Sequence, residues 1–256
     1  MDSVYHFISQ YFFVYIWLII TTFIDMIAPI SGSTVVNPVT AFFTDPQRAI
    51  GISSLLFFFT GVYRVYLFRK ELLSDKVNLK VFSSMLPFTI AGAICGGLFI
   101  SYLNIKILVL MIISVSIYYI FKNLYQLIKN KKTELKITGL SFIFIATISG
   151  FFQASGMPGG DIKRNYLRTV LSEISVRAVS SALGMINLFI GGTIIFLRNK
   201  LTHGDLILII TVLPFLLLAL KYGKTFLEKI PDRHAKILAS SLSFLGIVLL
   251  IYKYFL

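Results

Sequence analysis

The residues best suited to chemistry lie in two breaks of long apolar runs, one in each half of the chain. The second break, Ser155–Gly160, reads SGMPGG, and the first, Ala28–Ser33, reads APISGS. Glycine and proline at this density interrupt a helix. A helix that begins inside a membrane protein presents unpaired N–H groups and the positive end of its dipole, which can bind an anion. The expected contacts are the glycines and serines of both breaks: Ser31, Gly32, Ser33, Ser155, Gly156, Gly159 and Gly160.

Close packing of helices through small residues would explain a single break of this kind equally well. Two breaks in equivalent places favour a binding site, because paired interruptions in the two halves of a membrane chain point to one. Asn187 lies within an apolar run and is expected to hydrogen-bond either a ligand or a neighbouring helix.

Ionisable residues within apolar runs are the candidates for coupling or gating. Asp25 precedes the first break, where it would carry a coupling proton or hold a cation; alternatively, it would cap the broken helix or lie at the membrane interface at little cost. Arg48 and Arg177 open equivalent helices, where they would either guide an anion towards the breaks or have an ordinary interfacial role.

Three basic residues, Lys163, Arg164 and Arg168, follow the second break directly. They would form an electropositive funnel for an anion, or they would anchor this segment on acidic lipid at the cytoplasmic surface. The lipid anchor is the favoured interpretation.

Motifs for catalysis or metal binding are not found. The histidines His6, His203 and His234 are scattered, Cys95 is the single cysteine, and the sequence has no HExxH, CxxC, GxSxG or P-loop motif. We therefore expect no catalytic residue, no metal and no cofactor, and a protein that is not an enzyme. Without a P-loop, coupling to ATP would need a separate subunit, so transport driven by an ion gradient or passive flux is the simpler interpretation.

The elements that position these residues are membrane-spanning helices. Of the 256 residues 57% are hydrophobic, and the mean hydropathy is +0.84. The apolar runs predict an all-α polytopic protein of the cell membrane, with about eight full transmembrane helices and two short broken or re-entrant helices. The net charge of +13 is interpreted as basic cytoplasmic loops that attract acidic lipids. A nucleic-acid partner is excluded, because no binding module or basic-aromatic surface is found.

The chain divides into two similar halves. Residues 1–128 are the first repeat, 129–136 are a basic linker, and 137–256 are the second repeat. With a nearly constant offset, residues of one half align with the same type in the other: Pro29 with Pro158, Arg48 with Arg177, Pro87 with Pro214 and Gly96 with Gly223. This common register predicts an internal duplication.

Two topologies fit these halves. If the short segments after the breaks are re-entrant, eight crossings and parallel repeats result. If each segment crosses, the repeats are inverted and most lysines and arginines lie on one side, which the positive-inside rule favours. Against a crossing, the charged residues within 161–171 are poorly suited to contact with lipid. A helix that crosses half of the membrane and lines a cavity would satisfy both the positive-inside rule and these charges. The polar stretch Arg69–Lys80 is expected to be a loop.

The second half of the chain reads SGFFQASGMPGG, SVRAVSSALGMINLFIGG and VLPFLLLALKYGKTFLEKIP, and the first half reads IDMIAPISGS and LPFTIAGAICGGLF. With these segments the chain resembles the sulfite exporter TauE/SafE family of membrane transporters over nearly its whole length. These segments match the family's duplicated order of apolar helix, glycine-rich turn, short helix and glycine-studded helix. Only Gly32 stands where the first turn of the family usually has several glycines, and Asp161 follows the second glycine pair. The resemblance implies export or uptake of small sulfur-containing or organic anions, and these departures leave the substrate open.

We therefore expect a secondary transporter, an exporter of a small anion such as sulfite or an organosulfonate, that works by alternating access between two repeats. Two alternatives stay open. One is a non-transporting membrane scaffold or partner subunit, and the other is a carrier of another small solute that uses Asp25. The oligomeric state is left undetermined by the sequence.

Overall fold

The computed structural model describes residues 2–27, 32–129, 139–157, 159–226 and 232–256. Within these ranges the regular secondary structure is entirely helical. The helices are α1 (Asp2–Ile27), α2 (Gly32–Phe43), α3 (Pro46–Leu67), α4 (Arg69–Ser74), α5 (Lys76–Tyr102), α6 (Ile105–Lys129), α7 (Gly139–Ala154), α8 (Gly159–Leu167), α9 (Glu173–Leu197), α10 (His203–Phe226) and α11 (Asp232–Phe255). The all-α class is confirmed, and a short helix, α2 or α8, follows each predicted break.

Six helices in the described ranges are long and apolar enough to cross a membrane. The candidate spans are Pro46–Leu67, Lys76–Tyr102, Ile105–Lys122, Glu173–Leu197, His203–Gly223 and Ile237–Phe255. Helices α1 and α7 carry shorter apolar stretches, Tyr11–Ile24 and Ser141–Ala154. The structure thus supports a multi-pass membrane protein with six candidate spans, and the count of eight stays a prediction.

One expected boundary is wrong. The predicted loop Arg69–Lys80 instead holds α4 and the first turn of α5. The Asp75 side chain accepts a hydrogen bond from the Val77 amide at 2.8 Å, which caps α5 and lets it begin at Lys76. Ser172 caps α9 in the same way, through a hydrogen bond from the Ser175 amide, so that helix begins at Glu173.

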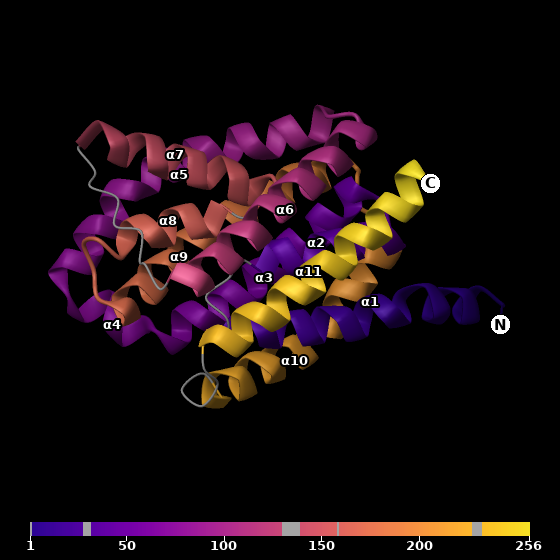
Figure 1. The fold of residues 1–256 in the computed structure, drawn as a ribbon, viewed down its shortest axis with the longest axis horizontal. Coiled ribbons are helices and arrows are strands. Elements are labelled where there is room, and N and C mark those ends of the chain that lie inside the picture. Colours follow the sequence, from indigo (N-terminus) through magenta and orange to yellow (C-terminus); the bar gives the residue numbers. More distant parts are fainter. Residues whose placement is uncertain (1, 28–31, 130–138, 158, 227–231) are drawn as a thin grey trace.

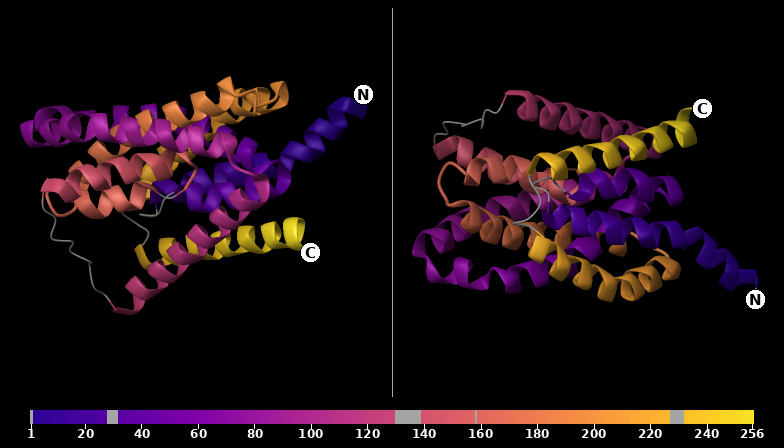
Figure 2. Two further views of the ribbon diagram at one scale, coloured as in Figure 1. Left: turned by 90° about the horizontal axis from the view of Figure 1, so that it is seen from above. Right: turned by 60° about the horizontal axis from the view of Figure 1, so that its bottom comes forward.

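Helices of the two halves are interleaved. In the middle, α3 packs against α9; α5 of the first half packs against α7 and α9, and α10 of the second half packs against α1 and α3. Most helices lie along the longest axis of the molecule, and both chain ends lie at the same end of it (Figure 1). The further views in Figure 2 show both ends at this same end of the molecule, on opposite sides of it.

The contact between α5 and α7 is a backbone contact made by glycine. A Cβ atom at Gly92 would lie 2.0 Å from the Thr147 carbonyl oxygen, and one at Gly96 would lie 2.2 Å from the Phe151 carbonyl oxygen. Small residues four positions apart allow such an approach between membrane helices. This packing fixes α7, and with it the second break, against the first half.

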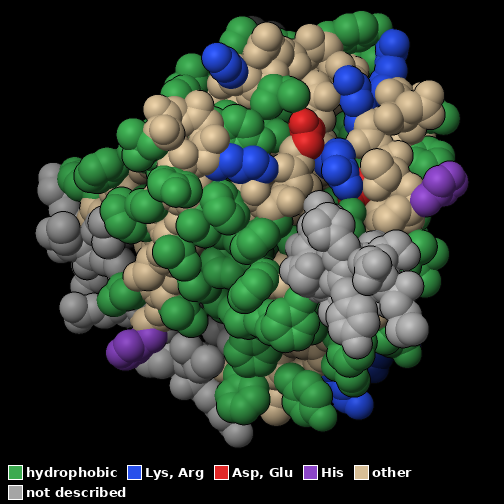
Figure 3. Space-filling model, turned by 90° about the vertical axis from the view of Figure 1, so that its right-hand side faces the viewer, with side chains coloured by type: hydrophobic (Ala, Val, Ile, Leu, Met, Phe, Trp, Pro, Cys, Tyr) green, Lys and Arg blue, Asp and Glu red, His purple; other side chains and the backbone are tan. Residues whose placement is uncertain are grey.

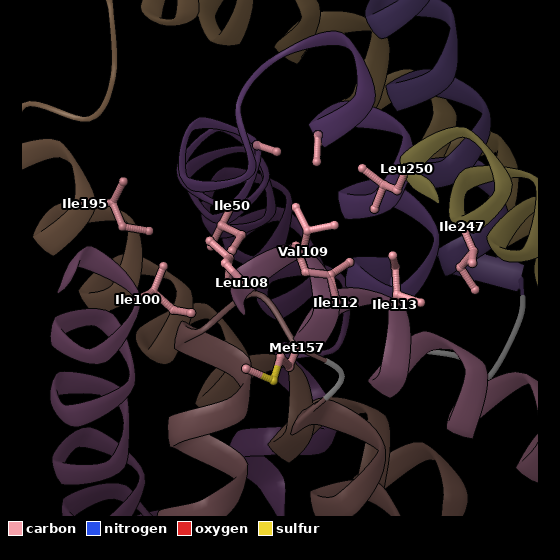
Figure 4. Packing of buried hydrophobic residues seen from close by; sticks show 12 residues of the cluster. Ile50, Ile100, Leu108, Val109, Ile112, Ile113, Met157, Ile195, Ile247 and Leu250 are labelled. Carbon is pink, nitrogen blue, oxygen red and sulfur yellow. The ribbon is translucent and has the colours of Figure 1, made fainter. Parts of the chain in front are cut away.

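The second break also borders the largest apolar cluster. Met157 is buried there with Ile50 of α3, Leu108 of α6 and Ile195 of α9 (Figure 4). Outer helices meanwhile expose large hydrophobic side chains such as Phe121. Figure 3 shows one such face, on which hydrophobic side chains predominate and most lysines and arginines gather towards its upper part. An apolar exterior of this kind suits lipid.

Candidate functional site

Helix α7 ends at the second break in a left-handed turn. Gly156 has a φ of 70°, its amide donates to the Gln153 carbonyl at 3.2 Å, and the Met157 amide donates to the Phe152 carbonyl at 2.8 Å. This pair of bonds is a Schellman motif, in which the last carbonyls of a helix are satisfied by the turn that follows it. A glycine is needed here because side chains rarely adopt this φ.

The amides of Ser155, Gly156, Met157 and Gly159 are engaged within the chain in this conformation. The amides of Ser155 and Gly159 donate to the carbonyls of Phe151 and Met157, at 3.0 and 2.7 Å. The Ser155 hydroxyl also donates to the Phe151 carbonyl, at 2.7 Å. Gly160 is buried at the start of α8. That these residues contact an anion stays a prediction.

Helix α8 folds back onto α7 immediately after the break. A Cβ atom at Gly159 would lie 2.3 Å from the Ser149 carbonyl oxygen and 2.6 Å from the backbone nitrogen of Gln153, so the backbones of α8 and α7 are in contact. This fold-back turns the polar helix α8, which is not one of the candidate spans, towards the protein interior. The consequence is the burial of Lys163, whose exposed fraction is 0%.

Lys163, Gln153 and Asn187 form one buried polar group, which we name the Lys163 cluster. The Lys163 Nζ donates to the Gln153 Oε1 at 3.1 Å, and the Asn187 Nδ2 donates to the same oxygen at 3.2 Å. These side chains come from α8, α7 and α9. The interpretation of Lys163 as a lipid anchor is therefore wrong, because the side chain is enclosed by protein.

The Lys163 cluster carries a charge that is not balanced locally. Within the described residues, the Gln153 oxygen is the partner of the Lys163 ammonium, and no carboxylate lies within 4.0 Å of it. Burial, followed by the neighbouring Arg164 guanidinium, lowers the pKa of Lys163 to about 7. Asp161 is also buried, but its Oδ1 lies 3.9 Å from the Arg164 Nη1. Arg168 is exposed and pairs with Glu173 at 2.9 Å.

Asn187 is buried, and its side-chain carbonyl oxygen, Oδ1, accepts no hydrogen bond from the residues that the structure describes. The exposed fraction of the side chain is 0%. Gly184 lies one turn earlier on α9, where a Cβ atom would be 2.7 Å from the Gln153 Nε2. The absence of a side chain at Gly184 thus lets Gln153 lie against α9 and reach both donors.

The first half contacts the second break through α2 and α3. The Asn37 Nδ2 donates to the Gly156 carbonyl oxygen, and the Ser53 hydroxyl donates to the Asn37 Oδ1 at 2.6 Å. Sequence reasoning missed Asn37 and Gln153 as site residues. Each is an amide side chain in or beside an apolar run, which was the available sequence signal.

The first break itself lies largely outside the described residues. Ser31 falls there, with Ala28, Pro29 and Ile30. Gly32 and Ser33 form the start of α2, and Asp25 belongs to the end of α1. Their predicted contacts with a ligand or coupling ion stay predictions.

Arg48 joins the two halves through a buried carboxylate. Its Nη2 lies 2.8 Å from the Asp205 Oδ1 and its Nε lies 3.0 Å from the Oδ2, while the Asp205 side chain is 0% exposed. The Tyr11 hydroxyl and the Thr202 amide and hydroxyl also donate to this carboxylate. The aligned residue Arg177 is half-buried near the start of α9. The structure thus places Arg48 in an ion pair between α3 and α10.

Comparison with protein families gives one match of nearly full length. The model of the family described as "Sulfite exporter TauE/SafE" matches residues 14–250. No curated protein and no solved structure matched the chain. The matched region includes both breaks, the Lys163 cluster and the pair of Arg48 and Asp205. With its apolar helices and this match over most of its length, the chain belongs to the sulfite exporter TauE/SafE family of membrane transporters.

Proposed function

We propose that the protein is a secondary transporter that exports a small anion, such as sulfite or an organosulfonate, across the cell membrane, and that Lys163 supplies the positive charge at its binding site. The observation that carries this proposal is the complete burial of the Lys163 side chain beside an amide oxygen. Family membership supports the anionic substrate and the exporter description supports the direction.

A buried ammonium group without a countercharge is costly, because its hydration is lost and little replaces it. Fully buried ionisable residues in membrane proteins therefore mark functional sites by default. An anion bound next to the Lys163 Nζ would supply the missing countercharge. Gln153 would hold the lysine in place, since its Oε1 accepts a hydrogen bond from the Nζ.

Alternating access is supported by the way in which the halves pack. The helix that corresponds to α5 is α10 and the one that corresponds to α7 is α1, so the packing of α5 on α7 is repeated by the packing of α10 on α1. Helix α3 packs on α9, its own counterpart. Two inverted repeats related by an approximate two-fold axis would produce this exchange. Neither Lys163 nor Asn187 is exposed, so this conformation would be an occluded state.

The ion pair between Arg48 and Asp205 is the proposed gate. It joins the first turn of α3 to the first turn of α10, which belong to different halves. If the halves rock against one another, a pair that bridges them away from the hinge would break and reform in each cycle. In this scheme Asp25 and Arg177 keep their predicted roles in coupling and gating.

The test is uptake of radiolabelled sulfite into proteoliposomes that contain acidic lipid. Lys163→Met should abolish flux, whereas Lys163→Arg, which retains the charge, should keep part of it. Arg168→Met is the matched control, because Arg168 follows in the same segment but is exposed and bonded to Glu173. Flux through Lys163→Met equal to that of the wild type would contradict the role of Lys163. If liposomes that contain the wild-type protein took up none of a broad panel of anions, a non-transporting scaffold would be favoured instead.

A further inference from the structure

The orientation of the Asn187 amide is fixed by the lysine beside it. An ammonium group has donors and no acceptor, so the Gln153 atom that faces the Lys163 Nζ must be the oxygen. The Asn187 atom 3.2 Å from this oxygen must in turn be a donor, the Nδ2. The Asn187 Oδ1 therefore points away from Gln153, and it has no hydrogen-bond partner among the residues that the structure describes.

A buried carbonyl oxygen without a donor is rare, because each unmade hydrogen bond leaves its desolvation uncompensated. The Lys163 Nζ and the Asn187 Nδ2 share one acceptor, so they are separated by no more than the sum of two hydrogen-bond distances. The Asn187 Oδ1 is bonded to the same carbon as the Nδ2, so an oxyanion beside the lysine would also be within reach of the Oδ1. Such a molecule would have to bring a negative charge for the lysine and a donor for the Oδ1.

We propose that the transported anion is bound in a singly charged form that carries one O–H group, as in hydrogensulfite, with its charge at Lys163 and its O–H donated to the Asn187 Oδ1. This inference rests on the proposed function and names the substrate class of the same site. A dianion such as sulfite or sulfate has no proton to donate, and it would leave the Oδ1 unsatisfied. An alkylsulfonate without a hydroxyl group would do the same.

The test compares two anions of equal charge and similar shape. At mildly acidic pH methylphosphonate is a monoanion with one O–H, whereas methanesulfonate is a monoanion without one. We expect methylphosphonate to compete with radiolabelled sulfite in proteoliposomes about ten-fold more strongly, as the loss of one hydrogen bond to a buried acceptor implies.

Two variants of Asn187 provide matched controls. Asn187→Thr keeps an oxygen that accepts a hydrogen bond, and Asn187→Val replaces that oxygen with a methyl group of similar size. The preference for methylphosphonate should persist in the first variant and disappear in the second.

The outcomes separate this inference from the proposed function. Sulfite flux with equal competition by the two anions would overturn the inference alone, and it would mean that water satisfies the Oδ1. Retention of the preference in Asn187→Val would overturn the assignment to Asn187. Absence of flux with every anion would overturn the proposed function itself.

Discussion

The side-chain amide of Asn37 donates a hydrogen bond to the carbonyl oxygen of Gly156, so the first short helix holds the turn that ends α7. The Oδ1 of the same residue accepts the Ser53 hydroxyl at 2.6 Å. One buried amide thus connects α2, α3 and the second break, and it links two halves of the chain that meet at a basic linker.

Replacing Asn37 with Leu should destabilise the protein by about 1–3 kcal/mol, because the buried Gly156 carbonyl loses its side-chain donor. The thermal midpoint in detergent should fall by about 2–4 °C for each kcal/mol. Ser53→Ala is the control, since it removes one bond of the asparagine and leaves the other. An unchanged midpoint for Asn37→Leu would show that the contact with Gly156 contributes nothing.

Replacing Arg48 with Met should be more destabilising, by about 3–5 kcal/mol, because it leaves the fully buried Asp205 carboxylate without its charged partner. Arg48→Lys should destabilise the protein less than Arg48→Met does. Some loss of stability should remain, since lysine cannot reproduce the two-point contact of the guanidinium. Thermal unfolding in detergent measures both. Arg198→Met is a suitable comparison because Arg198 is exposed, and a similar loss there would argue against a special role for the buried pair.

Transport should depend on pH through Lys163. Burial lowers the pKa of this residue to about 7, so the folded protein loses the charge as the pH rises through 7 while the unfolded chain keeps it. Uptake of a labelled hydroxyalkylsulfonate such as 2-hydroxyethanesulfonate, which has a fixed negative charge and one O–H group, should therefore fall as the pH rises through about 7. In Lys163→Arg the guanidinium stays charged, and the fall should be absent.

The same lowered pKa should make the protein more stable as the pH rises, whereas transport falls. Between the folded pKa of about 7 and the usual value for lysine the unfolded state binds more protons, so the free energy of unfolding rises with pH across this window. Below the window the full penalty of the buried charge is present. Subtracting the profile of Lys163→Met isolates this contribution, and parallel profiles would contradict the assignment.

Replacing Gly184 with Ala should weaken anion binding several-fold without unfolding the protein. The new methyl group would lie 2.7 Å from the Gln153 Nε2 and would push Gln153 away from α9, which disturbs the oxygen shared by Lys163 and Asn187. Gly192→Ala is the control on the same helix, because its methyl group would meet the Leu55 side chain instead. Competition assays in proteoliposomes report the affinity, and equal effects of the two substitutions would count against the role of Gln153.

The sequence predicted the helical class and the two short helices, because glycine and proline act locally on the backbone. The turn at Gly156 is an example, since its left-handed φ is a property that glycine supplies by itself. The start of α5 was misplaced for an equally local reason, namely the cap formed by Asp75, which the polar composition of the segment concealed.

The candidate site depends on long-range packing, which a single sequence does not encode in any local pattern. Lys163 lies in a polar segment and its burial follows from the close approach of α8 to α7 at Gly159. The ion pair of Arg48 and Asp205 joins residues 157 positions apart. Residue types and spacing identified Arg48 and Asn187 as candidates, but their partners came from the fold.

The interleaving of α5 with α7 and of α10 with α1 bears on how the chain is made in the cell. When synthesis reaches the linker, the glycine face of α5 still has no helix to cover it, because α7 has yet to emerge from the ribosome. Until α7 is inserted, the glycine face of α5 would contact lipid or an insertion chaperone. Two fragments cut within the linker and produced together should consequently assemble with each other, whereas either fragment alone should be degraded.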